Sequence, residues 1–269
     1  MLYFVATPIG NLKDMSFRAV ETLKEVDLIL CEDTRHSLKL LDFYGIKKPL
    51  KSYHKFNEKE RVEEIVSYLS EGKNVAVISD AGTPVISDPG NVLSTALRER
   101  GVDYTVIPGA TAFVPALILS GLSASNFTFV GFLPEKNKDR KTLLKRYESR
   151  PETLIFYSAP HDVEKTLTYL HEGLGERKVA LVKEITKLHE TVYTGVLGSI
   201  EINEPKGEFV IVVDGAKDTA TDFEMSEKEH IEYYLEKGYS KKDAIKIVAE
   251  ERGVSKNSLY KYTIEKEQD

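Results

Sequence analysis

The sequence has a single cysteine, Cys31, and no tryptophan among its 269 residues. One cysteine cannot form an internal disulfide, which fits a reducing compartment. No apolar run approaches the roughly 18 residues that a membrane span needs. The first residues lack the basic and apolar regions of a signal peptide. We therefore expect a cytoplasmic protein that does not engage a membrane.

Several ligand-binding motifs are also missing. The chain has no G-x-x-x-x-G-K-[ST], no G-x-G-x-x-G, no H-E-x-x-H, no cysteine pair and no G-x-S-x-G. Because these motifs are absent, the sequence gives no motif evidence for a phosphate-binding loop, the usual dinucleotide site, a zinc centre or a serine hydrolase. We expect no metal ion. A ligand held by backbone groups and apolar side chains stays compatible with the sequence.

Short apolar runs alternate with amphipathic stretches in the first part of the chain. The runs LYFVAT (2–7), DLILCE (27–32), NVAVIS (74–79) and YTVIP (104–108) are rich in β-branched residues, and turn residues follow each one. Helical periodicity appears between them. Alternating strands and helices predict a mostly parallel sheet with helices on both faces.

A second set of strands begins near residue 126. FTFVGFLP, TLIFYSAP and KVALVKEI alternate with helical stretches, whereas TVYTGVLG and EFVIVVDG are separated by only nine residues, SIEINEPKG. We expect these last two to form an antiparallel pair. The fold class is therefore α/β, with domains at 1–117 and 118–217, a polar linker at 218–225 and a small helical domain at 226–269.

Turn-rich loops follow the strands of the first domain. They are TPIGN, CEDTRHS, SDAGTPVISDPG and PGATA. Ligands of open parallel sheets bind beyond the carboxyl ends of the strands. One such loop alone indicates only a tight turn. Four of them at one edge predict a pocket.

Five ordered segments carry a family resemblance. They are VATPIGNLKDMSFRA, CEDTRHSLKLL, ISDAGTPVISDPG, VIPGATAFVPAL and VKEITKLHE. Together they resemble the S-adenosylmethionine-dependent tetrapyrrole methylase superfamily, and within it the branch that methylates ribosomal RNA. The resemblance implies methyl transfer from S-adenosylmethionine to a cytidine ribose 2′-hydroxyl of 16S rRNA in the small ribosomal subunit. It also implies a donor cleft between the two α/β domains, and a homodimer.

The same resemblance implies a set of donor-binding residues. The superfamily's Gly-Asp-Pro-like turn matches Gly82-Thr83-Pro84, where Thr replaces the acid. A glycine permits close backbone approach, and the proline fixes the turn. The implied donor-binding residues are Pro8, Ile9, Ala81, Gly82, Thr83, Ile86, Thr111, Ala112, Tyr157 and Glu184.

A ribose hydroxyl is a weak acid, so a base or a cation near its oxygen favours the transfer. Asp33 and Arg35 follow the second strand, Asp80 and Asp88 bracket the loop SDAGTPVISDPG, and Lys187 and Glu190 lie in VKEITKLHE. We expect Asp33 or Glu190 to act as base and Lys187 or Arg35 to steady the oxygen. The alternatives are a local Asp–Arg pair, a solvated strand end, and proximity alone without a base.

Two segments carry local positive charge although the net charge is −6. Residues 45–61 hold six Lys/Arg against two acids, with Tyr53 and Phe56 interleaved, and residues 134–150 hold seven against three. Both fit phosphate contacts, with the aromatic rings as stacking partners. The alternative is a pair of solvated charged faces.

The tail allows two interpretations. Its spacing of apolar residues suits a helix-turn-helix with Lys256, Asn257 and Lys261 presented, and Gly253 at the turn. Yet residues 226–269 hold nine Lys/Arg against ten Asp/Glu, which suits a packing module equally well.

Two other functions compete with RNA methylation. One is methylation of a tetrapyrrole or another small molecule by the same core. The other is a DNA-binding regulator whose α/β part senses a ligand. The near-neutral tail argues against a regulator, and the basic segments favour RNA over a small molecule.

Overall fold

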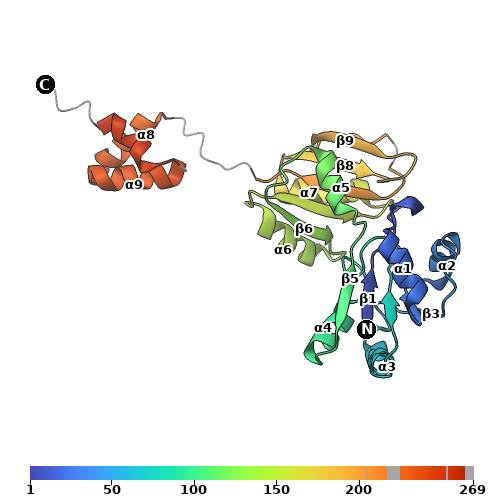
Figure 1. Cartoon of the computed structure of the whole chain (residues 1–269). Coiled ribbons are helices and arrows are strands. Elements are labelled where there is room, and N and C mark those ends of the chain that lie inside the picture. Colours follow the sequence, from blue (N-terminus) through green and yellow to red (C-terminus); the bar gives the residue numbers. More distant parts are fainter. Residues whose placement is uncertain (204, 217–224, 253, 264–269) are drawn as a thin grey trace.

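The computed structural model describes residues 1–203, 205–216, 225–252 and 254–263. The predicted linker at 218–225, apart from residue 225, and Gly253 lie outside the described residues. Within the described part, the chain forms two α/β units and a helical C-terminal cluster (Figure 1), so the predicted fold class is confirmed.

The first unit contains a five-stranded sheet of order β3-β2-β4-β1-β5, and every pairing in it is parallel. Its strands are β1 (Leu2–Val5), β2 (Leu28–Cys31), β3 (Leu50–Ser52), β4 (Val75–Val77) and β5 (Tyr104–Ile107). Its helices are η1 (Leu12–Asp14), α1 (Phe17–Glu25), α2 (Thr34–Phe43), α3 (Glu58–Ser70) and α4 (Asn91–Glu99). The four strands expected from the sequence are confirmed, and β3 is an additional strand that the sequence pattern does not predict.

Alternation along the strands divides the core of this unit into two layers. Val5, Ile29 and Ala76 face α1 and α2, whereas Phe4 and Leu30 face α3 and α4. Because both faces are covered, the strands are almost continuously apolar. Because every pairing is parallel, the carboxyl ends of all five strands meet at one edge of the sheet.

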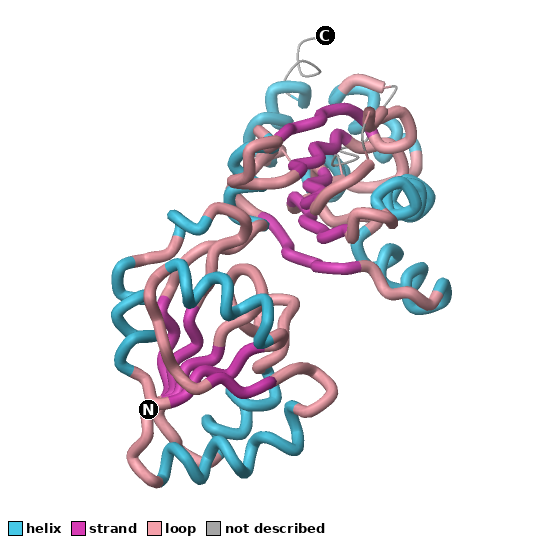
Figure 2. Tube along the Cα trace, turned by 90° about the vertical axis from the view of Figure 1, so that its right-hand side faces the viewer, coloured by secondary structure: helices cyan, strands magenta, loops and turns pink. Residues whose placement is uncertain are grey.

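The second sheet is mixed, with order β6-β7-β10-β8-β9. Its strands are β6 (Phe127–Phe132), β7 (Thr153–Ser158), β8 (Lys178–Lys183), β9 (Thr191–Val196) and β10 (Phe209–Val213). Helices α6 (Asn137–Tyr147) and α7 (Val163–Leu174) cover one face, and α5 (Phe113–Ser120) covers the other. Figure 2 shows the two sheets as separate magenta layers.

The expected antiparallel pair of the last two strands is wrong. β9 pairs with β8, and β10 inserts between β7 and β8, antiparallel to both. All five residues of β10 are buried. A fully apolar strand gains more from the sheet centre than from its edge, which decides the order.

Helix α5 follows the first sheet in the chain but packs on the second. Its Ala116 and Leu117 join the core formed by Ile155, Val182 and Val210. The chain thus crosses between the units before α5, and the predicted boundary at 117/118 falls inside this helix.

The C-terminal cluster has its own small core. It consists of α8 (Glu227–Glu236), α9 (Lys241–Arg252), α10 (Lys256–Leu259) and the 3-10 helix η2 (Tyr260–Thr263). Ile231, Ala244, Val248 and Leu259 are buried within it. A capping box of Ser226 and Glu229 starts α8.

Candidate active site

Two adjoining cavities lie at the carboxyl edge of the first sheet. The first, which we call the cleft cavity, has a volume of about 360 Å³ and is lined by residues of both α/β units. The second, the loop cavity, has about 390 Å³ and carries His36, Lys39 and Lys187 on its walls. Both cavities share four lining residues: Ile9, Asp80, Ala81 and Glu208.

The structure brings most of the predicted donor-binding residues to these cavities. Ile9, Ala81, Gly82, Ile86, Ala112 and Tyr157 line the cleft cavity, and Pro8 lines the loop cavity. Thr83, Thr111 and Glu184 line neither. The loops after β1, β4 and β5 therefore converge, because parallel strands end at one edge.

The turn after β4 is tied to the turn after β1. Thr7 and Gly82 exchange two backbone hydrogen bonds, at 2.8 and 3.2 Å. Gly82 has φ +86, and a Cβ there would lie 3.3 Å from the Ile9 side chain. The Thr83 hydroxyl donates to the Ala110 carbonyl at 3.0 Å. Thr83 thus holds the two loops together, and Gly82 keeps the cavity wall free of a side chain.

The same turn bends sharply at two non-glycine residues. Val85 has φ 77 and Ser87 has φ 69, a left-handed conformation that costs a β-branched residue most. Val85 packs into the core beneath the turn, whereas Ile86 is 38% exposed and lines the cleft cavity. The bend thus turns Val85 toward the core and Ile86 toward the cleft cavity.

Asp33 and Arg35 lie outside both linings and pair with each other. Asp33 is the N-cap of α2, and the Arg35 guanidinium donates to its carboxylate at 3.0 Å. Hydrogen bonds from the Arg35 side chain and backbone lower the pKa of Asp33 to about 2. The Asp33 backbone N–H donates to Asp80 at 3.3 Å. This pair orders the loop beside the cavities.

The turn after β8 brings the second unit to the first. Lys187 lines the loop cavity, and its ammonium contacts Glu208 at 2.8 Å and Glu184 at 3.3 Å. Burial alone lowers the pKa of Lys187, but these two carboxylates outweigh it and raise the pKa. Glu190 accepts a hydrogen bond from the Thr186 N–H at 2.7 Å, which braces the turn.

Several lining residues were not among those predicted from sequence. Phe132 and Ser158 end β6 and β7, so the strand-end rule applied to the second unit would have found them. Glu208 precedes β10, which runs antiparallel to β7 and β8. Its place at the cleft depends on a topology that the sequence did not reveal.

Asp88 is a further lining residue with an unusual environment. Burial raises its pKa to about 7, and repulsion from Glu32 and then Asp80 adds to the shift. Asp88 is among the polar residues that the sequence offers near the ribose oxygen, but the base expected from the sequence is Asp33 or Glu190.

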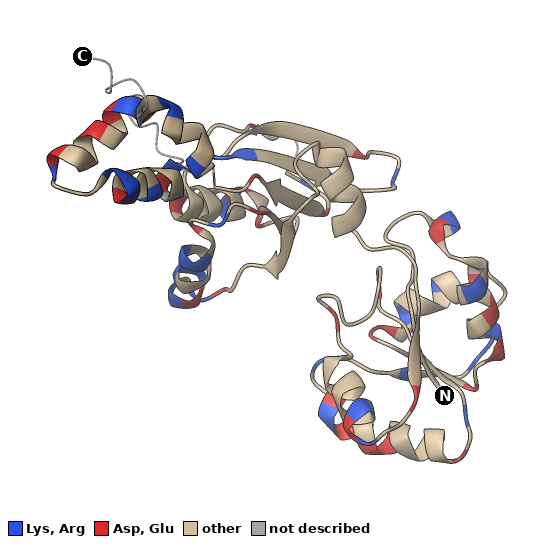
Figure 3. Ribbon diagram, turned by 60° about the vertical axis from the view of Figure 1, so that its left-hand side comes forward, with Lys and Arg blue, Asp and Glu red and all other residues tan. Residues whose placement is uncertain are grey.

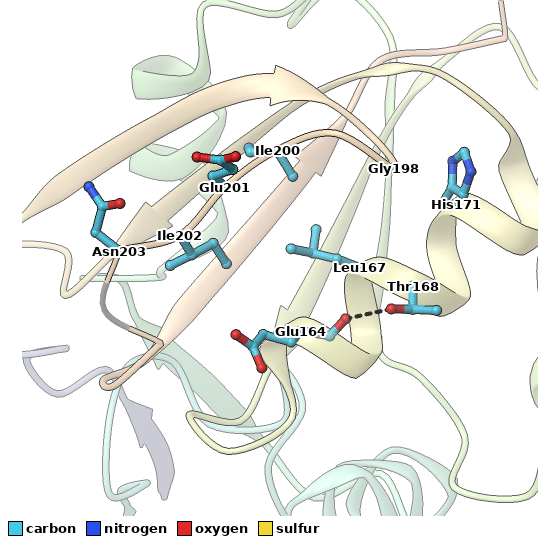
Figure 4. Close-up of a pocket in the computed structure, with 9 residues that line it drawn as sticks. All are labelled: Glu164, Leu167, Thr168, His171, Gly198, Ile200, Glu201, Ile202 and Asn203. Carbon is cyan, nitrogen blue, oxygen red and sulfur yellow. Dashed lines mark hydrogen bonds between the residues drawn. The ribbon is translucent and has the colours of Figure 1, made fainter.

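A larger cavity of about 630 Å³ lies elsewhere, between α7 and residues 198–203 (Figure 4). Its floor is Leu167, Ile200 and Ile202, and the Thr168 hydroxyl is bonded to the Glu164 carbonyl. None of the predicted site residues lines it. Size alone therefore does not mark the active site.

A family model described as Tetrapyrrole (Corrin/Porphyrin) Methylases matches residues 1–201. The chain belongs to the tetrapyrrole methylase family. It is therefore an S-adenosylmethionine-dependent methyltransferase. Two solved structures share the fold. They are a uroporphyrin-III-C-methyltransferase from Thermus thermophilus (22% identity, TM-score 0.55) and the methyltransferase CobJ (18%, 0.61), covering 78% and 80% of this chain and 93% and 94% of theirs.

Curated relatives are more similar in sequence. Proteins named ribosomal RNA small subunit methyltransferase I are 43% identical in Bacillus subtilis and 44% in Synechocystis, covering 97% and 100% of this chain and 92% and 99% of the relatives. A Thermotoga maritima protein of the same name is 44% identical over 218 residues, which are 80% of this chain and 98% of the relative.

The described residues include no helix with the length and apolarity needed to cross a bilayer.

Proposed function

We propose that this chain transfers a methyl group from S-adenosylmethionine to the 2′-hydroxyl of a cytidine ribose in 16S rRNA. The observation that carries the proposal is the identity of 41–44% to relatives whose printed name specifies small-subunit ribosomal RNA. We further propose that the reaction takes place in the cytoplasm on the small ribosomal subunit, and that the enzyme is a homodimer.

The cleft cavity suits the methyl donor. Its volume falls in the range of about 300–1,000 Å³ typical of small-molecule sites. Gly82 leaves space against the backbone, and Ile9, Ile86 and Ala112 offer apolar surface for the adenosyl group. The carboxylate of Asp80, which faces this cavity, offers negative charge to the cationic groups of the donor. When bound, the donor supplies an electrophilic methyl carbon on a sulfonium.

The loop cavity adjoins that site and carries Lys39 and Lys187 beside Asp80 and Glu208. We propose that the target ribose enters through it and lies where the two cavities meet, with Lys187 near the acceptor oxygen. His36 and Lys39 would then face the flanking phosphates. Asp33 and Arg35 would fix the loop between β2 and α2, and Glu190 the turn that carries Lys187. Holding donor and ribose in line supplies about 7–11 kcal/mol of the barrier.

Labelled donor separates this function from its rivals. We expect label in 16S rRNA or assembled 30S subunits, removable by RNase, with nucleoside analysis giving 2′-O-methylcytidine. Label in a uroporphyrin substrate alone would favour the small-molecule alternative. Duplex DNA binding without any transfer would favour a regulator. Sedimentation equilibrium tests the dimer, and a monomer at every concentration would contradict it.

The donor site has its own test. Ile86→Ala removes a lining side chain, and we expect donor affinity measured by calorimetry to fall about 5–30-fold, from the transfer energy of the lost methylenes. Leu188→Ala is the matched control, since Leu188 is 92% exposed in a loop and lines neither cavity. Equal affinities of the two variants would remove Ile86 from the donor site.

A further inference from the structure

Asp88 faces the cleft cavity, yet no described residue neutralises it. Its side chain is half-buried. Among the described residues, no hydrogen bond or ion pair engages its carboxylate. A desolvated carboxylate without a donor or cation is costly, so folded proteins rarely keep one without a use.

The titratable groups around Asp88 come from four other places in the fold. Glu32 follows β2, Asp80 follows β4, Tyr157 ends β7 and Glu208 precedes β10. The first two carboxylates oppose ionisation of Asp88, and no cation appears among its electrostatic neighbours in the described residues. Burial and this repulsion together hold the pKa of Asp88 at about 7.

The backbone is anchored on both sides of Asp88. Gly90, two residues on, donates its N–H to the buried Glu58 carboxylate at 2.6 Å, and the Tyr53 hydroxyl donates to the same oxygen at 3.0 Å. On the other side, the left-handed residues Val85 and Ser87 fix the bend. A group held between two such anchors is pre-positioned toward the cavity.

Neither predicted base shares these properties. Asp33 is hydrogen-bonded to Arg35, and its pKa of about 2 makes it a poor proton acceptor at neutral pH. Glu190 is engaged by the Thr186 N–H. Asp80 also faces the cavity but accepts the Asp33 N–H.

We propose that Asp88 accepts the proton of the ribose 2′-hydroxyl during methyl transfer, a role that rests on the proposed function. The hydroxyl proton passes to the Asp88 carboxylate while the oxygen forms its bond to the methyl carbon. The carbon–sulfur bond breaks, and its electron pair stays on the sulfur of the departing thioether. Asp88 then returns the proton to water.

The test compares Asp88→Asn, Asp88→Glu and Asp80→Asn with the wild type, at saturating donor and 30S subunits, from pH 5.5 to 9. For the wild type we expect the turnover number to rise about tenfold per pH unit below a midpoint near 7. Asp88→Asn should lower the turnover number about 10²–10⁴-fold, and its turnover number should no longer change with pH. Asp88→Glu should recover part of the rate. Asp80→Asn should move the midpoint to lower pH, because it removes a repelling charge.

Two measurements keep the outcome unambiguous. Circular dichroism and donor calorimetry should show a folded Asp88→Asn variant with donor affinity within about threefold of wild type. Asp42→Asn, an exposed change on α2, is the control and should leave the profile unchanged.

Turnover of Asp88→Asn at the wild-type rate would overturn the inference while the proposed function stands. Loss of donor affinity by more than tenfold would also overturn it and make Asp88 a counter-charge for the donor. A wild type that binds donor but methylates no 16S rRNA would refute the proposed function itself, and this role with it.

Discussion

Asp88 and Arg140 show how a side chain's surroundings decide its role. Asp88 lies in a turn-rich loop and Arg140 in a basic segment; in the fold Asp88 is half-buried and Arg140 is buried. Asp88 has no cationic partner among the described residues, whereas Arg140 is surrounded by acceptors. Stability measurements should therefore respond to each in a different way.

Asp88→Asn should raise stability at neutral pH. The folded state raises the pKa of Asp88 to about 7, so it binds the proton more tightly than the unfolded chain. The contribution of Asp88 to the free energy of unfolding is fully present below the unfolded pKa near 4. It is lost as the pH rises toward 7. We expect the variant to gain about 1–2 kcal/mol above pH 7, allowing for solvent screening, and little at pH 4. Urea denaturation at several pH values measures the difference in the free energy of unfolding between variant and wild type. A difference that does not change with pH would contradict the prediction.

Arg140 does not belong to the basic surface expected from the sequence. It is 8% exposed, donates to the carbonyls of Pro134 and Glu135 at 3.1 Å each, and lies 3.5 Å from the Tyr169 ring centroid. Arg140 is therefore not available as one of the phosphate contacts that segment 134–150 suggests. Tyr53, expected as a stacking partner, is also buried, with its hydroxyl on Glu58.

Arg140→Ala should destabilise the second unit. The change leaves the carbonyls of Pro134 and Glu135 without this hydrogen-bond donor and removes the contact with the Tyr169 ring. We therefore expect a loss of about 2–4 kcal/mol in the free energy of unfolding. Arg146→Ala, at an exposed position of the same helix, should cost less than about 0.5 kcal/mol. Similar costs for the two variants would count against the structural role of Arg140.

At the scale of elements, the remaining basic side chains of α6 form an exposed surface suited to RNA. Lys138, Lys141 and Lys145 are exposed, and Figure 3 shows Lys and Arg gathered along this helix. The helix follows β6, whose last residue, Phe132, lines the cleft cavity. The surface therefore begins near the proposed site.

Charge reversal on α6 should weaken RNA binding without affecting the donor. For Lys138→Glu with Lys141→Glu we expect RNA affinity to fall at least tenfold and the salt dependence of log K to decrease by about one for each phosphate that is no longer neutralised. Donor affinity should be unchanged. The matched control is Lys24→Glu, in the last turn of α1, because that end lies at the opposite edge of the sheet. An identical salt slope in the double variant would exclude α6 from the interface.

At the scale of the whole molecule, a few contacts join parts that are distant in sequence. The Asn11 N–H donates to the Thr186 hydroxyl at 3.1 Å, which links the turns after β1 and β8. The helical tail, in contrast, has a core made only of its own residues. The cleft cavity and the tail are therefore separable in packing terms.

Deletion of residues 218–269 should leave the cleft intact. We expect donor affinity within about threefold of the full chain, since none of the tail residues that the structure describes lines either cavity. RNA affinity measured on the same variant separates the two interpretations of the tail. A drop favours a nucleic-acid reader, and no change favours a packing module. Loss of donor binding would contradict separability.

The sequence by itself determined the strands, the two α/β units and the loops that converge, because period, β-branching and turn residues are local properties. It also determined family membership, through motifs in those loops. The tertiary structure alone decided which charges face the cleft, and it alone inserted β10 between β7 and β8. That insertion brings Glu208 to the cavity beside Asp88. Burial, partner choice and strand order depend on residues far apart in the chain, so no local pattern encodes them.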